Sequence, residues 1–154
     1  MKAKGKKAEF SPERLARRRK TADLLSGIGL TVIAIGLLVP LFNLLHTEVV
    51  ADFKWIYTLG AVLFLGARCI DTSDPSEPAR IRRMRRMEFW AGVAFAAGAF
   101  FWFYDSSRLG SLAGPLAVMR NTILFSLAGA MIQVISSWMI YFAAKKLARG
   151  EKKD

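Results

Sequence analysis

Charged residues are strongly segregated along this chain, and that segregation constrains the fold more than any other feature. Asp, Glu, Lys and Arg are absent from four apolar runs, 24–45, 55–67, 89–104 and 121–144, and crowd into the segments between them. A soluble helix carries charged residues along its water-facing side, so uncharged runs of this length are not typical of a soluble protein. The pattern predicts an all-α integral membrane protein, a four-helix bundle of transmembrane segments.

The lengths of the runs set the expected helices. At about 1.5 Å per residue, the first and fourth runs each exceed the roughly 30 Å of a hydrocarbon core. The second and third are shorter, and they span only if Lys54, Arg68 and Arg86 extend their charged heads toward the interfaces. We expect one transmembrane domain over 21–146, with basic cytoplasmic segments at 1–20 and 147–154. Its helices cover about 21–45, 52–70, 86–104 and 116–146.

The basic residues predict the orientation. The chain has 23 Lys and Arg against 12 Asp and Glu, and most of the basic residues lie before the first helix, around the middle connection and after the last helix. With four spans these places share one face of the membrane, which the positive-inside rule makes cytoplasmic. We predict a multi-pass protein of the bacterial inner membrane with both termini in the cytoplasm. Because topology accounts for the net charge of +11, we expect no nucleic-acid partner.

Two basic clusters are candidates for contact with anionic lipid head groups. Residues 12–20 predict a short basic interfacial helix, which Ser11 can cap and which a hydrophobic staple of Phe10 on Leu15 can fix. The alternative for both clusters is a topology signal that binds nothing. The candidate head-group contacts are Arg17, Arg18, Arg19, Arg68, Arg82, Arg83, Arg85 and Arg86.

Proline and aromatic residues mark the outer ends of the first two helices. Pro40 predicts a kink in the first helix, since it lacks an N–H and its ring clashes with the preceding turn. Asn43 can bond to the freed backbone, to a neighbouring helix or to water, and we favour water. Trp55 and Tyr57 are expected in an outer aromatic belt.

The fourth predicted helix carries polar and small residues at spacings of three and four, which places them on one face. A polar stripe is unfavourable against lipid, so it should face inward and join helices through hydrogen bonds. Counting back from Lys145 places Gln133 near the bilayer midplane. Helix packing is the favoured role, and the lining of a solute path is the alternative. The stripe consists of Thr122, Ser126, Gly129, Gln133, Ser136 and Ser137.

The third predicted helix has two overlapping pairs of small residues. Gly92 with Ala96, and Ala94 with Gly98, are each four residues apart and would let a neighbouring backbone approach closely. These faces make self-association of the chain a reasonable expectation.

Residues for catalysis or metal binding are scarce. The chain has one histidine, His46, and one cysteine, Cys69, so we expect no metal, no cofactor and no enzymatic activity. Arg68 could pair with Glu88, Asp71 or a lipid phosphate, and snorkelling to the interface is the favoured expectation. An enzyme acting at head-group level through Arg68 and Glu88 is the weakest of the functional alternatives.

Two stretches of the second half carry a resemblance. The segment 82–90, which reads RRMRRMEFW, together with Gln133 and the segment 136–140, SSWMI, resembles short uncharacterised four-helix inner-membrane proteins of Bacteroidetes-type bacteria. The resemblance covers the third and fourth predicted helices. It implies the membrane fold and location, and it implies no activity.

The functional expectation follows from these patterns. We expect a polytopic inner-membrane protein that acts as an interaction or assembly subunit, packed through small and hydroxyl residues. Its expected partners are anionic membrane lipids on the cytoplasmic side, and a second copy or another membrane protein. The alternative is a channel or facilitator for a small neutral or lipidic solute, lined by the fourth helix.

Overall fold

Four long helices make up the described part of the protein, residues 12–71, 79–109 and 114–150 of the computed structural model. They are α1 (Pro12–Phe42), α2 (Thr47–Asp71), α3 (Ala79–Leu109) and α4 (Pro115–Gly150). Each contains a stretch long and apolar enough to cross a membrane: Ala16–Phe42, Glu48–Ile70, Ile81–Leu109 and Pro115–Lys146. The predicted all-α architecture with four membrane-spanning helices is confirmed at this level of length and composition.

The basic ends of α1 and α3 belong to the helices themselves. α1 runs without interruption from Pro12 into the first apolar run, so the expectation of a separate interfacial helix over 12–20 is wrong. Arg and Lys are good helix formers, and no Gly or Pro separates 12–20 from 21 onward, so the helix has no reason to break. α3 likewise begins at Ala79, earlier than predicted. The cap and staple expected of Phe10, Ser11 and Leu15 lie outside the residues whose side chains are described.

Pro40 acts at the end of α1. The helix ends at Phe42, two residues after the buried Pro40 and earlier than predicted. The side-chain amide of Asn43 donates a hydrogen bond to Val39 O at 2.8 Å, and Asn43 N donates to Pro40 O at 3.1 Å. These bonds stabilise the turn that replaces the helix once proline has interrupted its hydrogen bonding. Asn43 therefore bonds to its own helix end, which differs from the favoured expectation of a residue bonded to water.

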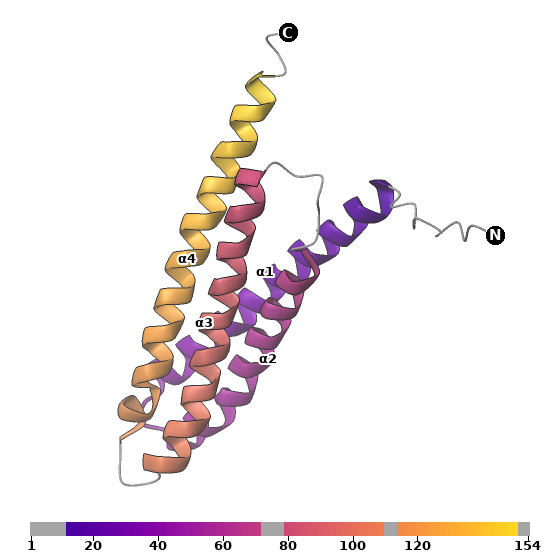
Figure 1. Ribbon diagram of the computed structural model, residues 1–154. Helices are drawn as coiled ribbons and strands as arrows, with labels where there is room; N and C mark the ends of the chain where they lie inside the picture. The colour runs from indigo at the N-terminus through magenta and orange to yellow at the C-terminus, as the bar shows by residue number, and fades with distance from the viewer. Residues whose placement is uncertain (1–11, 72–78, 110–113, 151–154) are drawn as a thin grey trace, which may run out of the picture.

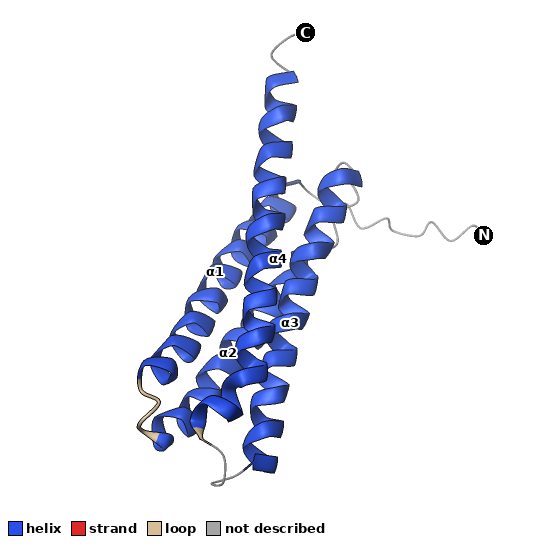
Figure 2. Ribbon diagram, turned by 90° about the vertical axis from the view of Figure 1, so that its left-hand side faces the viewer, coloured by secondary structure: helices blue, strands red, loops and turns tan. Residues whose placement is uncertain are grey.

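The four helices form two hairpins that pack side by side. α1 packs on α2, α3 packs on α4, and α2 joins the hairpins through α3. The N-terminal ends of α1 and α3 and the C-terminal ends of α2 and α4 lie at one end of the bundle, at the top in Figure 1. At that end α4 extends past α3, and α1 leans away from α4 (Figures 1 and 2).

One hydrophobic core connects all four helices. It includes Ile33 of α1, Phe64 of α2, Phe95 of α3 and Met119 of α4. The rings of Phe64 and Phe95 meet edge to face with centroids 5.5 Å apart, a favourable geometry for buried aromatic rings. The core therefore holds the two hairpins together as one unit.

Glycines allow α1 and α2 to approach closely. A Cβ on Gly29 would lie 2.8 Å from Phe64 N, one on Gly36 would lie 2.8 Å from Tyr57 Cα, and one on Gly60 would lie 2.7 Å from Ile33 N. Each clash is with backbone, which cannot move aside as a flexible side chain can. Backbone contact of this kind is how membrane helices gain van der Waals packing where lipid is as apolar as the helices.

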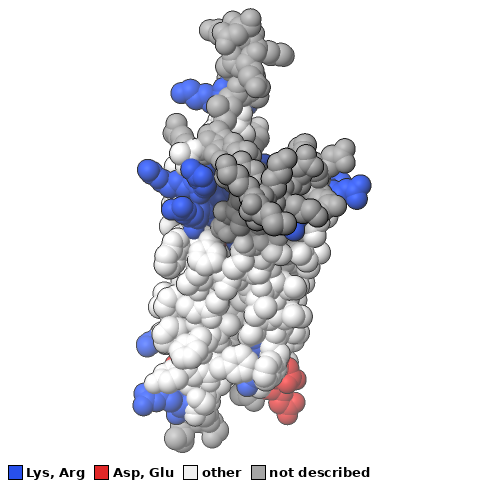
Figure 3. Space-filling view, turned by 45° about the vertical axis from the view of Figure 1, so that its right-hand side comes forward, with Lys and Arg blue, Asp and Glu red and all other residues white. Residues whose placement is uncertain are grey.

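The outer surface of the bundle is apolar. Large hydrophobic side chains such as Ile28, Val62, Phe100 and Leu127 are more than half exposed. Figure 3 shows one face, on which charged side chains gather toward the two ends and leave the middle of the described surface uncharged. A surface of this kind is suited to lipid tails rather than to water.

Candidate functional site

Four polar side chains from three helices form a cluster, which we call the Glu88 cluster. Arg68 of α2, Glu88 of α3 and Gln133 of α4 are buried, and Ser137 of α4 is exposed at the edge of the cluster. Glu88 is 4% exposed and Arg68 is 7% exposed. Arg68 Nη1 lies 3.0 Å from Glu88 Oε2. The other carboxylate oxygen, Oε1, accepts hydrogen bonds from Ser137 Oγ at 3.2 Å and from Gln133 Nε2 at 3.5 Å. The cluster thus joins the two hairpins.

The position of Arg68 corrects the sequence-based expectation. Arg68 was expected to snorkel to the head groups, whereas its side chain lies inside the bundle against Glu88. Its guanidinium carbon also lies 5.4 Å from the centre of the Phe64 ring, and Nη1 lies 3.8 Å from Asp23 Oδ1 of α1. A carboxylate within reach in a low-dielectric site binds arginine more strongly than a solvated surface does. The structure pairs Arg68 with Glu88, which the sequence analysis considered but did not favour.

Gln133 lies nearer the end of the bundle than expected. Counting back from Lys145 suggested the midplane, but Gln133 packs beside Glu88 and Arg68, and Arg68 lies within the last turn of α2. Because α4 extends past α3, the distance of a residue from the charged end of α4 does not by itself give its depth in the bundle. Gln133 Nε2 also donates to Ser137 Oγ at 3.1 Å. Gln133 Oε1 is buried without a hydrogen-bond partner among the described residues, which leaves one acceptor for water or another donor.

The bonding of the Glu88 cluster favours a structural role. The Glu88 carboxylate is fixed by a guanidinium on one oxygen and by a hydroxyl and an amide on the other. These bonds occupy both carboxylate oxygens with groups of the chain itself. Removing one partner of a buried ion pair leaves an uncompensated charge, which is the costly event in such sites. The cluster can therefore set how the two hairpins dock.

The N-terminal part of the α4 stripe forms a second network, around Tyr57 of α2. Tyr57 Oη and Ser126 Oγ lie 2.6 Å apart, and Tyr57 Oη donates to Phe95 O at 3.3 Å. Thr122 Oγ1 donates to Gly98 O of α3 at 3.0 Å, and Ser126 Oγ lies 2.7 Å from Thr122 O. These bonds connect α2, α3 and α4 at a second level of the bundle.

The structure buries most of the stripe. Thr122, Ser126, Gly129, Gln133 and Ser136 all lie in the interior, and Ser137 lies at its edge. Ser136 Oγ bonds within α4, to Ile132 O at 2.7 Å and to Gln133 O at 3.1 Å. A Cβ on Gly129 would lie 3.1 Å from Ala91 O of α3, so glycine here permits the close contact of α3 with α4.

Tyr57 is the main residue of the interior that sequence analysis assigned wrongly. It was placed with Trp55 in an outer aromatic belt, yet Tyr57 is 0% exposed and Trp55 is 65% exposed. Residues two apart on a helix are separated by about 200°, so both cannot face lipid. That spacing is the signal that could have identified Tyr57 as buried. Its ring packs on Trp102, with centroids 5.6 Å apart.

A polar pair at the opposite end of the bundle was also missed. Asn121 Nδ2 of α4 donates to Asp105 Oδ2 of α3 at 2.9 Å, and Asp105 is 8% exposed. The sequence offers little signal for this pair, because it gives no indication of which residues of the two helices lie opposite each other. The pair joins the C-terminal part of α3 to the N-terminal part of α4.

The small residues of α3 contact helices of the same chain. Gly92 and Gly98 are buried, and Ala94 and Ala96 are partly buried. A Cβ on Gly92 would lie 3.0 Å from a Leu65 methyl carbon of α2, and one on Gly98 would lie 2.7 Å from Tyr57 Oη. Gly92 and Gly98 are thus used for packing within the chain.

The candidate head-group arginines differ in exposure. Arg17, Arg18, Arg83 and Arg86 are exposed, and Arg19, Arg82 and Arg85 are partly buried. Of the candidate set, only Arg68 lies in the interior. The exposed members are placed where they can contact anions at the end of the bundle that carries the ends of α1 and α4.

Over 12–71, 79–109 and 114–150, no three His, Cys, Asp or Glu side chains come together as a metal site would require. Comparison with known proteins adds no relative: no family model, no curated protein and no solved structure matches the chain.

Proposed function

We propose that this chain is a non-enzymatic, four-span protein of the bacterial inner membrane that acts as an interaction or assembly subunit. The observation that carries the proposal is the fate of the polar stripe on α4. Each of its hydroxyl groups bonds to a carbonyl or side chain of this chain: Thr122 to Gly98, Ser126 to Thr122, Ser136 to Ile132 and Ser137 to Glu88. Polar groups used in this way serve to pack helices.

The same observation weighs against the channel or facilitator. A solute path needs polar groups that can exchange partners with the solute, and it needs a continuous opening. The stripe hydroxyls bond within the chain instead, and fully buried side chains such as Tyr57, Phe95 and Met119 occupy the space between the helices. An enzyme using Arg68 and Glu88 is disfavoured for a related reason, since the two side chains bind each other.

The proposed orientation places both ends of the chain in the cytoplasm. The basic first turns of α1 and α3 and the basic last turns of α4 lie at the same end of the bundle. Lys and Arg are retained on the cytoplasmic side of bacterial membranes, and this end carries most of them. Anionic head groups of that leaflet are the proposed lipid partners.

The proposed assembly surface lies on the lipid-facing side of α1. Gly27, Thr31 and Ala34 are exposed and fall along one face. A Cβ on Gly27 would meet no atom within 4 Å, and the Thr31 hydroxyl is satisfied by Gly27 O at 3.0 Å. A face of small residues lets another transmembrane helix approach closely. This face is the one we expect a second copy or another membrane protein to use.

Gly27→Leu is expected to disrupt assembly without weakening the fold, because the added side chain enters open space and blocks a neighbouring helix. Cross-linking in native membranes, followed by sizing in mild detergent, should convert the assembled wild type into the single chain. Gly66→Leu is the matched control, since Gly66 of α2 is also open. Glycerol and water flux into proteoliposomes should stay at the protein-free rate for all three proteins. A wild type that is already monomeric and conducts solute would contradict the proposal.

A further inference from the structure

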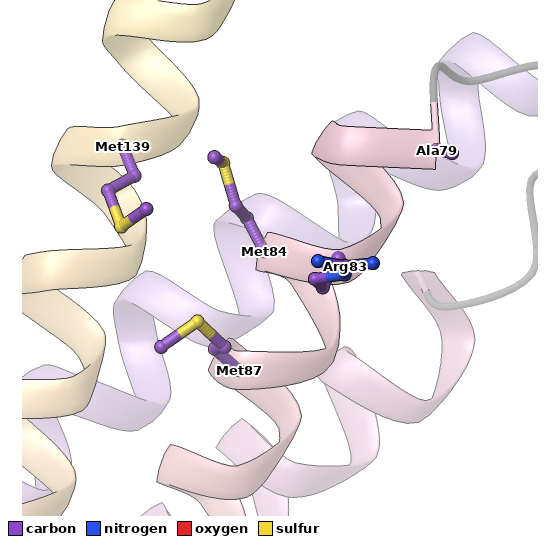
Figure 4. Close-up of a pocket in the computed structure, with 5 residues that line it drawn as sticks. All are labelled: Ala79, Arg83, Met84, Met87 and Met139. Carbon is purple, nitrogen blue, oxygen red and sulfur yellow. The ribbon is translucent and has the colours of Figure 1, made fainter.

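A methionine-lined groove runs between the first turns of α3 and the last turns of α4, at the end of the bundle where α4 extends past α3. One part has a volume of about 400 Å³ and is lined by Ala79, Arg83, Met84, Met87 and Met139. Figure 4 shows Met84 and Met87 projecting from α3 toward Met139 on α4. An adjoining part of about 210 Å³ shares Met84 and Met139 and adds Phe142, Ala143 and Lys146.

We propose that this groove binds one anionic phospholipid, with its phosphate at Arg83 and Lys146 and an acyl chain along the methionines. The inference rests on the proposed function, in which the basic end of the bundle lies at the cytoplasmic face of the membrane. It names the lipid that binds at that end.

The order of residues along the groove fits such a ligand. Because α3 and α4 are antiparallel, going from Ala79 to Met87 on α3 and from Lys146 to Met139 on α4 leads in the same direction, from the polar end of the groove into the bundle. Lys146 therefore lies toward the polar end, and Met87 lies deepest on α3. The apolar spans of both helices end here, at Ile81 and Lys146. An anionic phospholipid has its groups in a matching order, with a charged head group followed by an apolar acyl chain. Methionine side chains are flexible and adapt to a chain of variable conformation.

Charge complementarity selects an anionic head group over a zwitterionic one. Among the residues whose side chains are described, the lining of the two parts contains two cations and no acid. The nearest buried acid along α3, Glu88, is held by Arg68 at 3.0 Å, so it does not neutralise the groove. The exposed Arg86 and Lys145 flank it and add to its positive potential.

The test measures lipid retention by native mass spectrometry of the full chain in mild detergent. The probes are phosphatidylglycerol and phosphatidylcholine with identical acyl chains. We expect the first phosphatidylglycerol to bind more tightly than phosphatidylcholine. Arg83→Gln with Lys146→Gln should weaken it roughly 30-fold, because each cation near an anionic surface contributes a factor of about five. Arg108→Gln with Arg120→Gln is the matched control, since it removes two exposed cations of α3 and α4 at the other end of the bundle and should have little effect.

A second variant tests the apolar part of the groove. Ala143→Phe fills it without changing charge and should reduce phosphatidylglycerol retention, while the melting temperature shows that the fold is kept. Equal weakening in the two double variants, or equal retention of both lipids by the wild type, would overturn the proposal. So would a photoreactive residue at position 143 that cross-links to an acidic protein instead of lipid. Assembly of Gly27→Leu is measured separately, so failure here is distinguishable from failure of the proposed function.

Discussion

Replacing Arg68 with methionine is expected to lower the free energy of unfolding by about 3 to 5 kcal/mol, because it removes a guanidinium that lies 3.0 Å from the buried Glu88 carboxylate. Methionine keeps most of the side-chain volume of arginine, so the expected loss of unfolding free energy comes from the missing charge and not from a cavity. The carboxylate retains Ser137 and Gln133 as donors, and these neutral groups cannot balance its charge. Titration of the purified protein with denaturing detergent in mixed micelles gives the change in unfolding free energy.

Two further variants separate the ion pair from other effects of the Arg68 substitution. Arg86→Met removes an exposed cation two residues before Glu88, and it should change stability little, as surface charges generally do. Adding Glu88→Gln to Arg68→Met should recover much of the loss, since it removes the stranded charge. If Arg68→Met were no more destabilising than Arg86→Met, the Glu88 cluster would not be the junction between the hairpins.

Gly60→Ala is expected to destabilise the protein by about 3 kcal/mol, at the upper end for overpacking a close contact. The new methyl group would lie 2.7 Å from Ile33 N and 2.9 Å from Gly29 O. Both are backbone atoms of α1, so the two helices must separate to admit it. The same detergent titration measures the loss, and circular dichroism should show that helix content is kept.

Gly66→Ala provides the matched control on the same helix. A Cβ at Gly66 meets nothing within 4 Å, so the substitution should not lower the unfolding free energy, and the higher helix propensity of alanine should raise it by up to about 1 kcal/mol. Both glycines lie on α2 and are replaced by the same residue. They differ in their surroundings, since Gly60 faces the backbone of α1 and Gly66 faces open space. Equal effects at Gly60 and Gly66 would mean that backbone contact between α1 and α2 does not hold the first hairpin.

The four spans could be predicted from the sequence because exclusion of charge from lipid is a property of each segment alone. Helix ends were harder to predict. The basic residues that mark the membrane boundary are also good helix formers, so α1 and α3 continue through them. Pro40 had the opposite effect and ended α1 earlier than its apolar run does.

The candidate site was predicted in part. The α4 stripe follows from helical periodicity, and its burial in the structure agrees with the rule that polar faces avoid lipid. The partners of the stripe could not be predicted, because pairing depends on how far one helix is shifted along another. That shift places Gln133 beside Arg68 and Glu88, and it also decides that Tyr57 meets Ser126. The periodicity of one sequence shows which face of a helix is polar. It does not show which residues of a neighbouring helix that face contacts.

Cysteine accessibility in intact cells tests the central claim most directly, that four helices cross the membrane with the basic end of the bundle in the cytoplasm. In a Cys69→Ser background, His46→Cys reports on the turn between α1 and α2, and Lys146→Cys reports on the end of α4; both native side chains are exposed. We expect a membrane-impermeant maleimide, applied with the outer membrane opened, to label position 46 at once and position 146 only after the inner membrane is permeabilised. Labelling of position 146 in sealed cells, or protection of position 46, would contradict the account.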